Sequence, residues 1–329
     1  MASASLQQIF DSFNQLPVLV IGDVMLDAYI WGNVERVSPE APVPIVNVKQ
    51  RDYRLGGAAN VALNLKSLGA EPVLCALVGD DEAGAKFFDR LKFRNIAAEG
   101  IIVSKHRPTT VKTRVIASHQ HVVRVDDESD RPANAEEEAQ LLTMIDKLLP
   151  RCKAVIFEDY DKGVINERII AHVVAQADQL GIPSIVDPKK RNFLAYKEVS
   201  LFKPNLKELR EGLKLEIQSG NMEQVKSAVS QLKQLLNAKA LMVPLSEHGI
   251  YLDGEKAKIH QKAHAREIAD VSGAGDTVVS IAALCVAAGL SEEQTAALAN
   301  LGGGLVCQHV GVVPIDKHAL LKEAEKIWQ

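Results

Sequence analysis

The chain lacks several features that mark particular classes of protein. Its 38 Lys and Arg residues are outnumbered by 42 Asp and Glu residues and form no basic block, which argues against a nucleic-acid partner, since nucleic-acid binding needs clustered cations. No apolar run reaches transmembrane length, and the first twenty residues lack the basic start and apolar core of a signal peptide. We therefore expect a cytoplasmic protein with no membrane partner.

Cysteine is also scarce. The four cysteines, Cys75, Cys152, Cys285 and Cys307, are scattered, stand among apolar neighbours and form no Cys-x-x-Cys pair. A disulfide framework or a zinc site would need a closer, patterned spacing. We expect reduced thiols in the core.

Two common nucleotide-binding motifs are missing. The turn after the first apolar run reads VIGDVMLD (20–27), with one glycine where a dinucleotide-binding turn requires three at fixed spacing. The sequence GxxxxGK[ST] of a phosphate-binding loop is absent as well. A nucleotide site, if the chain has one, must therefore be built elsewhere.

Short apolar runs alternate with amphipathic segments along most of the chain. The strand candidates are 17–23, 71–79, 153–159, 183–188, 199–205 and 239–245. The helix candidates are 57–68, 82–93, 134–149, 166–180, 222–236, 275–289, 291–309 and 316–328. This alternation predicts an α/β fold, a doubly wound, mostly parallel sheet flanked by helices. No linker is long enough to force a second domain, so we expect a single domain over residues 1–329.

Two regions interrupt the alternation. Residues 28–50 hold three prolines and alternate polar with apolar residues, and residues 108–126 alternate around a polar turn at Ser118–His119–Gln120. We expect both to form a small β-sheet that projects from the main domain as a lid. His119 and His121 flank the turn, where an exposed polar tip is favoured over a metal site.

The stretch DVSGAGDT (270–277) precedes a long apolar run. Gly273, Ala274 and Gly275 allow close approach of a ligand to the backbone, and the following helix directs unpaired N–H groups and its positive end at the same loop. An anion site with a carboxylate beside it suits phosphoryl transfer to an alcohol, with Asp276 as the base. The alternative is that Asp276 is a favourable acid in a first helical turn and the glycines form a loop.

A second glycine-rich stretch, RLGGAANVALNLKSLGA (54–70), also opens a helix. Gly56 and Gly57 precede it, and Asn60 lies in its first turn, where its amide could bind sugar hydroxyls. A tight turn followed by close helix packing explains the same residues equally well.

These stretches together resemble the two signatures of the ribokinase-like (PfkB) carbohydrate kinases, over nearly the whole chain. GDVMLDAYIWGNVERVSPEAPVPIVNV, HRPTTVKTRVIASHQHVVRVD, EDYDKG, VDPKK, KPNLKEL and SEHG are similar to the D-β-D-heptose 7-phosphate kinase branch. The resemblance implies a ribokinase-like fold and ATP- and Mg²⁺-dependent phosphorylation of D-glycero-β-D-manno-heptose 7-phosphate at its 1-hydroxyl, for ADP-heptose and lipopolysaccharide core. A kinase for another sugar or sugar phosphate, or a non-catalytic sugar-phosphate-binding regulator, remains open. Because the chain ends at Gln329, it resembles the form without a fused adenylyltransferase.

The resemblance also assigns roles to residues. Asp276 would take the proton of the 1-hydroxyl, and the amides of Gly273, Ala274 and Gly275 would hold the phosphoryl group. Asn205 and Glu208 would orient magnesium through water, although Asn-x-x-Glu is also a helix capping box. The residues implied at the nucleotide are Asn205, Leu206, Lys207, Glu208, Ser246, Glu247, His248, Gly249, Asn300 and Gly303.

For the sugar, the resemblance implies Asp27, Gly56, Gly57 and Asn60. The distal phosphate of the substrate needs cations, for which arginine offers bidentate contacts and lysine a point charge. The candidates are Arg36, Arg114, Arg124, Lys162, Lys189 and Lys190. Lys189 ranks above Lys190 because it directly follows a strand end, where open α/β sheets bind ligands.

Three positions depart from the branch, all near the expected nucleotide side. Leu245 stands where arginine is common, Lys203 where threonine is usual and Val312 where threonine is frequent. They put details of the contact with ATP in doubt.

The lid segments carry alternating apolar residues, which would leave an exposed apolar patch on an isolated sheet. These residues are Ile45, Val46, Val48, Val111, Val115, Val122 and Val123. We expect a homodimer in which two lids cover each other, as the resemblance also suggests.

Overall fold

The main sheet of the molecule is nine-stranded and mostly parallel. The computed structural model describes residues 5–117, 120–218, 220–264 and 267–327. Within these ranges neighbouring strands pair in parallel, except for the last two pairings at one end of the sheet, which are antiparallel. In spatial order the strands are β13 (Lys258–Gln261), β12 (Ile250–Asp253), β11 (Ala240–Pro244), β10 (Leu201–Phe202), β9 (Ser184–Asp187), β8 (Ala154–Glu158), β1 (Pro17–Gly22), β4 (Glu71–Gly79) and β5 (Ala97–Ser104). The predicted fold class is confirmed, and β5, β12 and β13 are additional to the predicted strands.

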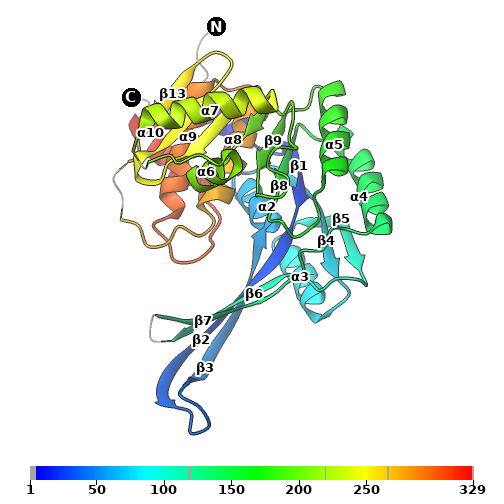
Figure 1. The fold of residues 1–329 in the computed structure, drawn as a ribbon, viewed down its shortest axis with the longest axis vertical. Helices are drawn as coiled ribbons and strands as arrows, with labels where there is room; N and C mark the ends of the chain where they lie inside the picture. Colours follow the sequence, from blue (N-terminus) through cyan, green and yellow to red (C-terminus); the bar gives the residue numbers. More distant parts are fainter. Residues whose placement is uncertain (1–4, 118–119, 219, 265–266, 328–329) are drawn as a thin grey trace.

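Helices cover both faces of this sheet (Figure 1). One face carries α1 (Leu6–Ser12), α2 (Ala58–Ser67), α3 (Glu82–Phe93), α8 (Ala274–Ala287), α9 (Glu292–Val306) and α10 (Lys317–Ile327). The other carries α4 (Ala135–Leu148), α5 (Glu167–Gln179), α6 (Leu206–Leu213) and α7 (Met222–Leu236), with short 3₁₀ turns η1 (Leu149–Arg151) and η2 (Ser246–His248) elsewhere in the chain. Every predicted helix is present, and α1 and α6 were not predicted.

Burial on both faces explains why the parallel strands are continuous apolar runs. In β8, Ile156 packs among α2 and α8, whereas its neighbour Phe157 packs among α4, α5 and α7. Parallel strands covered by helices on both sides have this composition. No helix of the described residues is long and apolar enough to cross a membrane.

The register of neighbouring strands aligns three charged residues at the carboxyl edge of the sheet. Glu158, the last residue of β8, pairs with Asp187, the last residue of β9. Phe202 of β10 pairs with Val186, which places Lys203 level with Asp187. Since side chains alternate along a strand, all three lie on the face covered by α2 and α8.

A second, four-stranded sheet projects from the main body (Figure 1). Its strands are, in spatial order, β3 (Pro44–Gly57), β2 (Val24–Val37), β6 (Val111–Ala117) and β7 (Gln120–Asp127). This small sheet contains both segments predicted for the projecting sheet, but β2 begins at Val24, earlier than expected. Ser118 and His119 of the predicted turn lie outside the described residues.

The small sheet continues directly from strand β1 of the main sheet. Asp23 alone separates β1 from β2, and its carboxylate accepts hydrogen bonds from the backbone N–H groups of Tyr160 (2.8 Å), Lys162 (3.1 Å) and Val164 (3.1 Å). Burial, and secondarily the nearby carboxylate of Asp159, raises the pKa of Asp23 to about 6. Asp23 therefore fixes the loop after β8 to the start of the small sheet.

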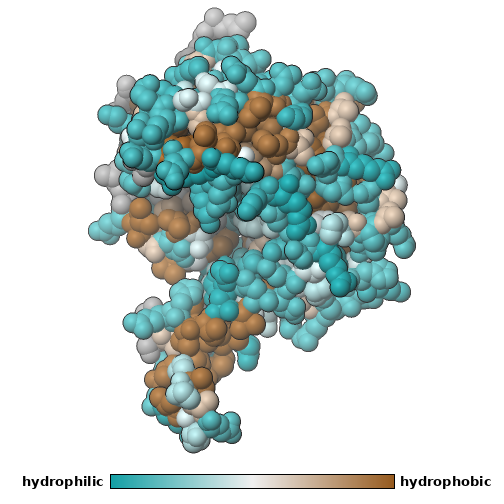
Figure 2. Space-filling model, viewed as in Figure 1, coloured by the Kyte–Doolittle hydropathy of each residue, from teal (hydrophilic) through white to brown (hydrophobic). Residues whose placement is uncertain are grey.

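Apolar side chains are exposed on the small sheet, and Figure 2 shows them as a brown area on the projecting part. Val48 and Val123, predicted to be exposed, are 45% and 49% exposed. Val37 (62%) and Val125 (55%) are exposed as well. The other predicted positions, Ile45, Val46, Val111, Val115 and Val122, are half-buried.

Candidate active site

The loop before α8 lies directly against the charged edge of the main sheet. Gly273 is the N-cap residue of α8 with φ 79°, and no side chain caps the helix. A Cβ atom at Gly275 would lie 3.6 Å from Oδ2 of Asp187 and 3.7 Å from Nζ of Lys203. The start of α8, which no side chain caps, therefore lies beside a carboxylate and an ammonium group, and a helix start of this kind can hold an anion.

Asp276, in the first turn of α8, is buried and doubly hydrogen-bonded. Its Oδ2 accepts from Nδ2 of Asn60 at 2.6 Å and its Oδ1 from the hydroxyl of Tyr160 at 3.0 Å. Burial, and to a smaller extent the negative charge of Asp187, raises the pKa of Asp276 to about 6, while the bonds from Asn60 and Tyr160 act in the opposite direction. A carboxylate with this pKa is ionised at neutral pH and is a stronger base than an ordinary aspartate.

Asn60, predicted to bind sugar hydroxyls, also contacts the predicted base. Its Oδ1 atom is buried and has no hydrogen-bond partner among the described residues. The amide therefore orients Asp276 through one end and leaves an acceptor available at the other.

Three buried carboxylates converge at this edge. One oxygen each of Glu158, Asp187 and Asp276 lies within 4.8 Å of the others, and Oε2 of Glu158 is buried without a partner in the described part of the chain. Burial, followed by the charges of Asp187 and Asp276, raises the pKa of Glu158 well above its usual value. Clustered carboxylate oxygens with an unpartnered member fit a hard cation such as Mg²⁺.

The sequence analysis did not predict Glu158 and Asp187 as site residues. Each ends a buried strand, in VIFED and SIVDP, where ligands bind in open α/β sheets. A carboxylate at the end of an apolar run is the signal that could have identified them.

The predicted magnesium residues form a capping box at the start of α6. Oδ1 of Asn205 accepts from the backbone N–H of Glu208 at 2.9 Å, and Oε2 of Glu208 accepts from that of Asn205 at 2.9 Å. Oε1 of Glu208 lies 2.6 Å from Nζ of Lys189. Of the neighbouring residues, Leu206 begins α6, and Lys207, 80% exposed, lies 3.8 Å from Glu211.

Lys189, a candidate for the distal phosphate that was ranked above Lys190, therefore contacts Glu208 of the predicted magnesium pair. Its Nζ also lies 5.1 Å from the ring centroid of Tyr160, the tyrosine that donates to Asp276. Burial lowers the pKa of Lys189, but the carboxylates of Asp187 and Glu208 raise it by more, so Lys189 stays cationic. The structure brings Lys189 to the edge of the main sheet.

The predicted sugar residues meet where the small sheet begins. Asp27 of β2 forms an ion pair with Arg114 of β6, and a Cβ atom at Gly56 would lie 2.3 Å from Oδ2 of Asp27. Gly57 (φ 59°) lies equally close to the backbone, because its Cβ atom would be 2.3 Å from the carbonyl oxygen of Asp23. Glycine is therefore required at Gly57, whereas a Cβ atom at Gly56 would displace the carboxylate of Asp27.

Two further residues complete this part of the small sheet. The guanidinium groups of Arg54 and Arg114 lie 4.7 and 5.4 Å from the ring centroid of Tyr29. Arg54 also donates to the carbonyl oxygen of Val312 at 3.3 Å, so the small sheet contacts the segment after α9. Neither Tyr29 nor Arg54 was predicted as a site residue. An aromatic side chain in a strand, such as that of Tyr29, is usually a packing residue.

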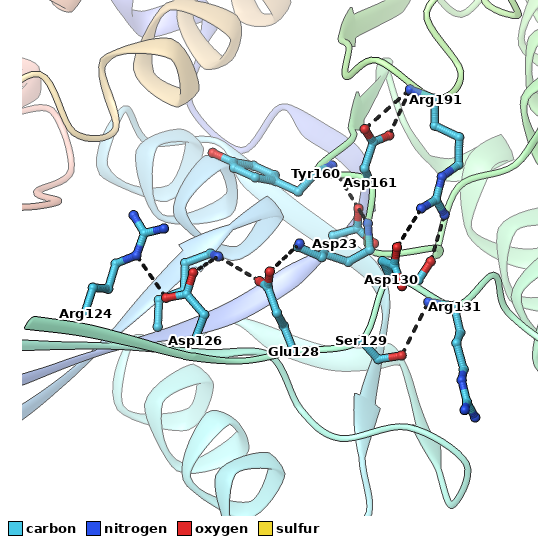
Figure 3. Close-up of polar contacts among 12 residues, drawn as sticks. Asp23, Arg124, Asp126, Glu128, Ser129, Asp130, Arg131, Tyr160, Asp161 and Arg191 are labelled. Carbon is cyan, nitrogen blue, oxygen red and sulfur yellow. Dashed lines mark hydrogen bonds and ion pairs between the residues drawn. The ribbon is translucent and has the colours of Figure 1, made fainter.

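The remaining cation candidates are bound to acidic side chains or exposed. Figure 3 shows Arg124 directed at Asp126, and Nε of Arg124 lies 2.9 Å from Oδ1 of Asp126. Arg124 is 59% exposed, and Lys162 pairs with Glu128 at 2.7 Å. Arg36 and Lys190 are exposed.

Apart from residues 205–208, the residues predicted at the nucleotide lie on two neighbouring segments. Ser246, Glu247 and His248 form η2 after β11, and the Cβ of a residue at Gly249 (φ 89°) would collide with the carbonyl oxygen of Gln261 at 2.0 Å. Nε2 of His248 lies 3.4 Å from Oε1 of Glu247.

On α9, Asn300 donates to the carbonyl oxygen of Lys262 at 2.8 Å, and Gly303 lets α9 approach Val278 of α8. Of the three departures, Leu245 and Lys203 are buried. Cγ1 of Val312 lies 3.4 Å from the position of a Cβ at Gly273, so Val312 also borders the site.

Comparison with known proteins gives a family and a set of relatives. A family model described as pfkB family carbohydrate kinase matches residues 16–318. "Bifunctional protein HldE" of Syntrophotalea carbinolica is 38% identical over 327 residues, 97% of this chain and 65% of that protein. The protein of the same name from Paramagnetospirillum magneticum is 41% identical over 295 residues, 89% of this chain and 60% of that protein. The chain thus spans less than two thirds of the length of these relatives.

Solved structures share the fold at low sequence identity. Phosphofructokinase-2 from Escherichia coli, in complex with potassium, has a TM-score of 0.78 at 18% identity, covering 96% of this chain and 100% of that one. Ribokinase from Arabidopsis thaliana, complexed with ribose and ATP, has a TM-score of 0.72 at 20% identity, covering 94% of this chain and 99% of that one. The predicted ribokinase-like fold is confirmed.

Proposed function

The chain belongs to the pfkB family of carbohydrate kinases, and on that premise we propose that it phosphorylates D-glycero-β-D-manno-heptose 7-phosphate at the 1-hydroxyl with ATP. The product, heptose 1,7-bisphosphate, is a precursor of ADP-heptose for the lipopolysaccharide core. Motifs of the heptose 7-phosphate kinase branch along the chain support the choice of sugar. The observation that carries the chemistry is the buried Asp276 beside the uncapped start of α8.

Asp276 accepts the proton of the sugar hydroxyl. The oxygen then forms a bond to the γ-phosphorus of ATP while the bond from that phosphorus to the β–γ bridging oxygen breaks, and ADP leaves with the bonding electrons. Asn60 and Tyr160 hold the carboxylate in one orientation through its two oxygens. Their hydrogen bonds also limit the rise in the pKa of Asp276 caused by burial.

The backbone of Gly273, Ala274 and Gly275 stabilises the charge on the phosphoryl oxygens, because the start of a helix directs N–H groups and a positive dipole end at an anion. Magnesium would be held by the carboxylates of Glu158 and Asp187, and Asn205 and Glu208 would orient it through water. When bound, the ion neutralises charge on the phosphates of ATP.

The sugar lies, in this proposal, between the edge of the main sheet and the small sheet. Asp27, Gly56 and Gly57 bind its hydroxyl groups, together with the free acceptor of Asn60. Arg114 and Arg124 from the small sheet and Lys189 from the edge are the cations proposed for the distal phosphate. ATP would contact the segments 205–208 and 246–249 with Asn300 and Gly303.

Turnover with a panel of sugars tests the proposal. ADP release is measured with heptose 7-phosphate, ribose and fructose 6-phosphate at equal concentration. We expect release with the heptose alone. Turnover of another sugar would make the chain a kinase of different specificity, and binding of sugar phosphate without turnover of any sugar would indicate a regulator.

We further propose that the active form is a homodimer in which two small sheets cover each other. The exposed side chains of Val37, Val48, Val123 and Val125 support this, because a monomer would leave them in water. Light scattering at micromolar concentration is expected to give twice the mass of one chain, and Val123→Asp with Val125→Asp to halve it. Leu180→Asp, at the 50% exposed C-cap residue of α5, is the control and leaves the mass unchanged.

A further inference from the structure

Lys203 is an unusual residue for its surroundings. It follows the two-residue strand β10, its side chain is 3% exposed, and it occupies a position where the resemblance to the heptose kinase branch predicts threonine. Burying an ammonium group costs several kcal/mol unless other groups compensate. A threonine would supply one hydroxyl there, whereas lysine adds a positive charge.

The ammonium group is oriented by Asp187. Nζ lies 2.9 Å from Oδ2 of Asp187. The side chains of Lys203 and Asp187 are 3% and 7% exposed, so this ion pair is shielded from water. An ammonium group has three N–H donors, and Asp187 is the one ion-pair partner that the described residues provide.

The ammonium group lies beside the loop proposed to hold the phosphoryl group. Nζ would lie 3.7 Å from a Cβ atom at Gly275, which is an ordinary van der Waals distance from the first turn of α8. The same short segment carries Asp276, on which the charge of Lys203 also acts. A phosphoryl group between the amides of α8 and the hydroxyl activated by Asp276 therefore comes within reach of Nζ.

We propose that Lys203 is a catalytic residue whose ammonium group contacts the non-bridging oxygens of the phosphoryl group during its transfer, held in place by Asp187. This proposal rests on the proposed kinase function and adds a residue to its mechanism. Lys203 neutralises charge and moves no proton: the proton of the sugar hydroxyl goes to Asp276, and the bonding electrons of the broken P–O bond go to ADP.

A role as the counter-ion of Asp187 alone would have different consequences. A counter-ion stabilises the fold, and its loss weakens the binding of every nucleotide to a similar extent. A group that contacts the transferred phosphoryl group distinguishes nucleotides with a γ-phosphate from those without one.

The test measures dissociation constants of ADP and of the non-hydrolysable β,γ-imido analogue of ATP for the wild-type chain, Lys203→Met and Lys203→Thr. Both variants are expected to reduce the preference for the analogue over ADP by about tenfold or more, and kcat by about 10²–10³-fold, as removal of one charge-stabilising donor does. The binding comparison is repeated in EDTA, because a contact made by the lysine itself persists without divalent ions.

Two further variants separate contact from stability. Lys203→Met with Asp187→Asn removes both charges, so a folded protein remains available if an unpaired Asp187 prevents folding of the single variant. Lys233→Met is the matched control: Lys233 pairs with the buried Asp253 at 2.9 Å. Asp253 pairs with Leu241 in register, at the end of β11 remote from η2. This control is expected to lower the melting temperature and leave the analogue-to-ADP ratio unchanged.

The outcomes distinguish the lysine from the function. An unchanged ratio, or an unchanged kcat, in folded Lys203 variants overturns the role of Lys203 while the kinase function stands. A ratio that depends on Lys203 in a chain that phosphorylates no sugar supports the phosphoryl contact and overturns the kinase function. A wild-type chain that binds neither nucleotide overturns both.

Discussion

The edge of the main sheet and the outer strand β7 of the small sheet differ in how far their charged side chains are exposed to water. At the edge, Lys203 and Asp187 are buried, with side chains 3% and 7% exposed, and Asp276 and Glu158 lie beside them. On the small sheet, Arg124 is 59% exposed and pairs with an acidic neighbour in the same strand. The groups proposed to carry out the reaction are buried, and electrostatic forces are stronger in the protein interior than in water. Charges that water screens are suited to recognition of a mobile substrate.

Replacing the buried base should produce the largest effect in this comparison. Asp276→Asn is expected to lower kcat by about 10²–10⁴-fold, roughly 3–5 kcal/mol in activation free energy, because the sugar hydroxyl loses its proton acceptor. Steady-state kinetics check the loss, and calorimetry with the sugar phosphate should show nearly unchanged affinity. Asp253→Asn, which neutralises a buried carboxylate away from the edge, is the control. A variant Asp276→Asn with wild-type kcat would remove Asp276 from the mechanism.

Changing the pH should alter the activity through Asp276, at the edge of the main sheet. Because burial raises the pKa of Asp276 to about 6 and only the ionised form accepts a proton, kcat/KM is expected to fall about tenfold per pH unit below 6. A pH–rate profile from pH 4.5 to 8 measures this limb. The residual activity of Asp276→Asn should not show this fall in kcat/KM below pH 6. If the variant shows the same fall, another group is responsible for the titration.

Removing one cation from each region would sharpen the comparison. Arg114→Ala on the small sheet is expected to raise the KM of the sugar phosphate about 10–100-fold with little change in the KM of ATP, as for loss of a charged hydrogen bond. For Lys189→Ala, the prediction from sequence is an increase in the KM of the sugar phosphate, whereas its contact with Glu208 favours an increase in that of ATP. Initial-rate kinetics with each substrate varied decide between them. Arg151→Ala, at a surface pair with Glu99, should change neither constant.

The smallest effect expected is on stability. Since Asp276 titrates near 6 when folded and near 3.8 when unfolded, the folded chain binds more protons between these values, and stability decreases as pH rises through that window. Asp276→Asn should therefore raise the free energy of unfolding at pH 7.5 by about 1–3 kcal/mol. Urea denaturation at pH 7.5 and pH 4.5 measures this gain, which should shrink at the lower pH. An equal gain at both values would exclude ionisation as its cause.

Much of the fold follows from local sequence. The runs at 17–23 and 71–79 became β1 and β4 because parallel strands covered on both faces need continuous apolar residues. The run at 199–205 was predicted too long. Pro204 has no backbone N–H to continue a ladder, so β10 holds only Leu201 and Phe202.

The site was predictable where one short motif carries it. Gly273 to Asp276 are adjacent in sequence, and the chemistry of a helix start follows from them. Glu158, Asp187 and Lys203 meet only through the register of three strands, which no local pattern specifies. The contact of Asn60 with Asp276 joins residues 216 positions apart and likewise requires the tertiary fold.

The passage of β1 into β2 has a consequence for substrate size. Gly22 pairs with Glu158 at the phosphoryl end, and Asp27 follows it by five residues along one nearly continuous strand. At the rise of an extended chain, these five residues span at most roughly 17 Å. In the proposed complex, this backbone length limits the separation between the phosphoryl group and a sugar hydroxyl bound by Asp27. Side-chain changes in the small sheet can alter which groups are recognised there, but they cannot lengthen that interval.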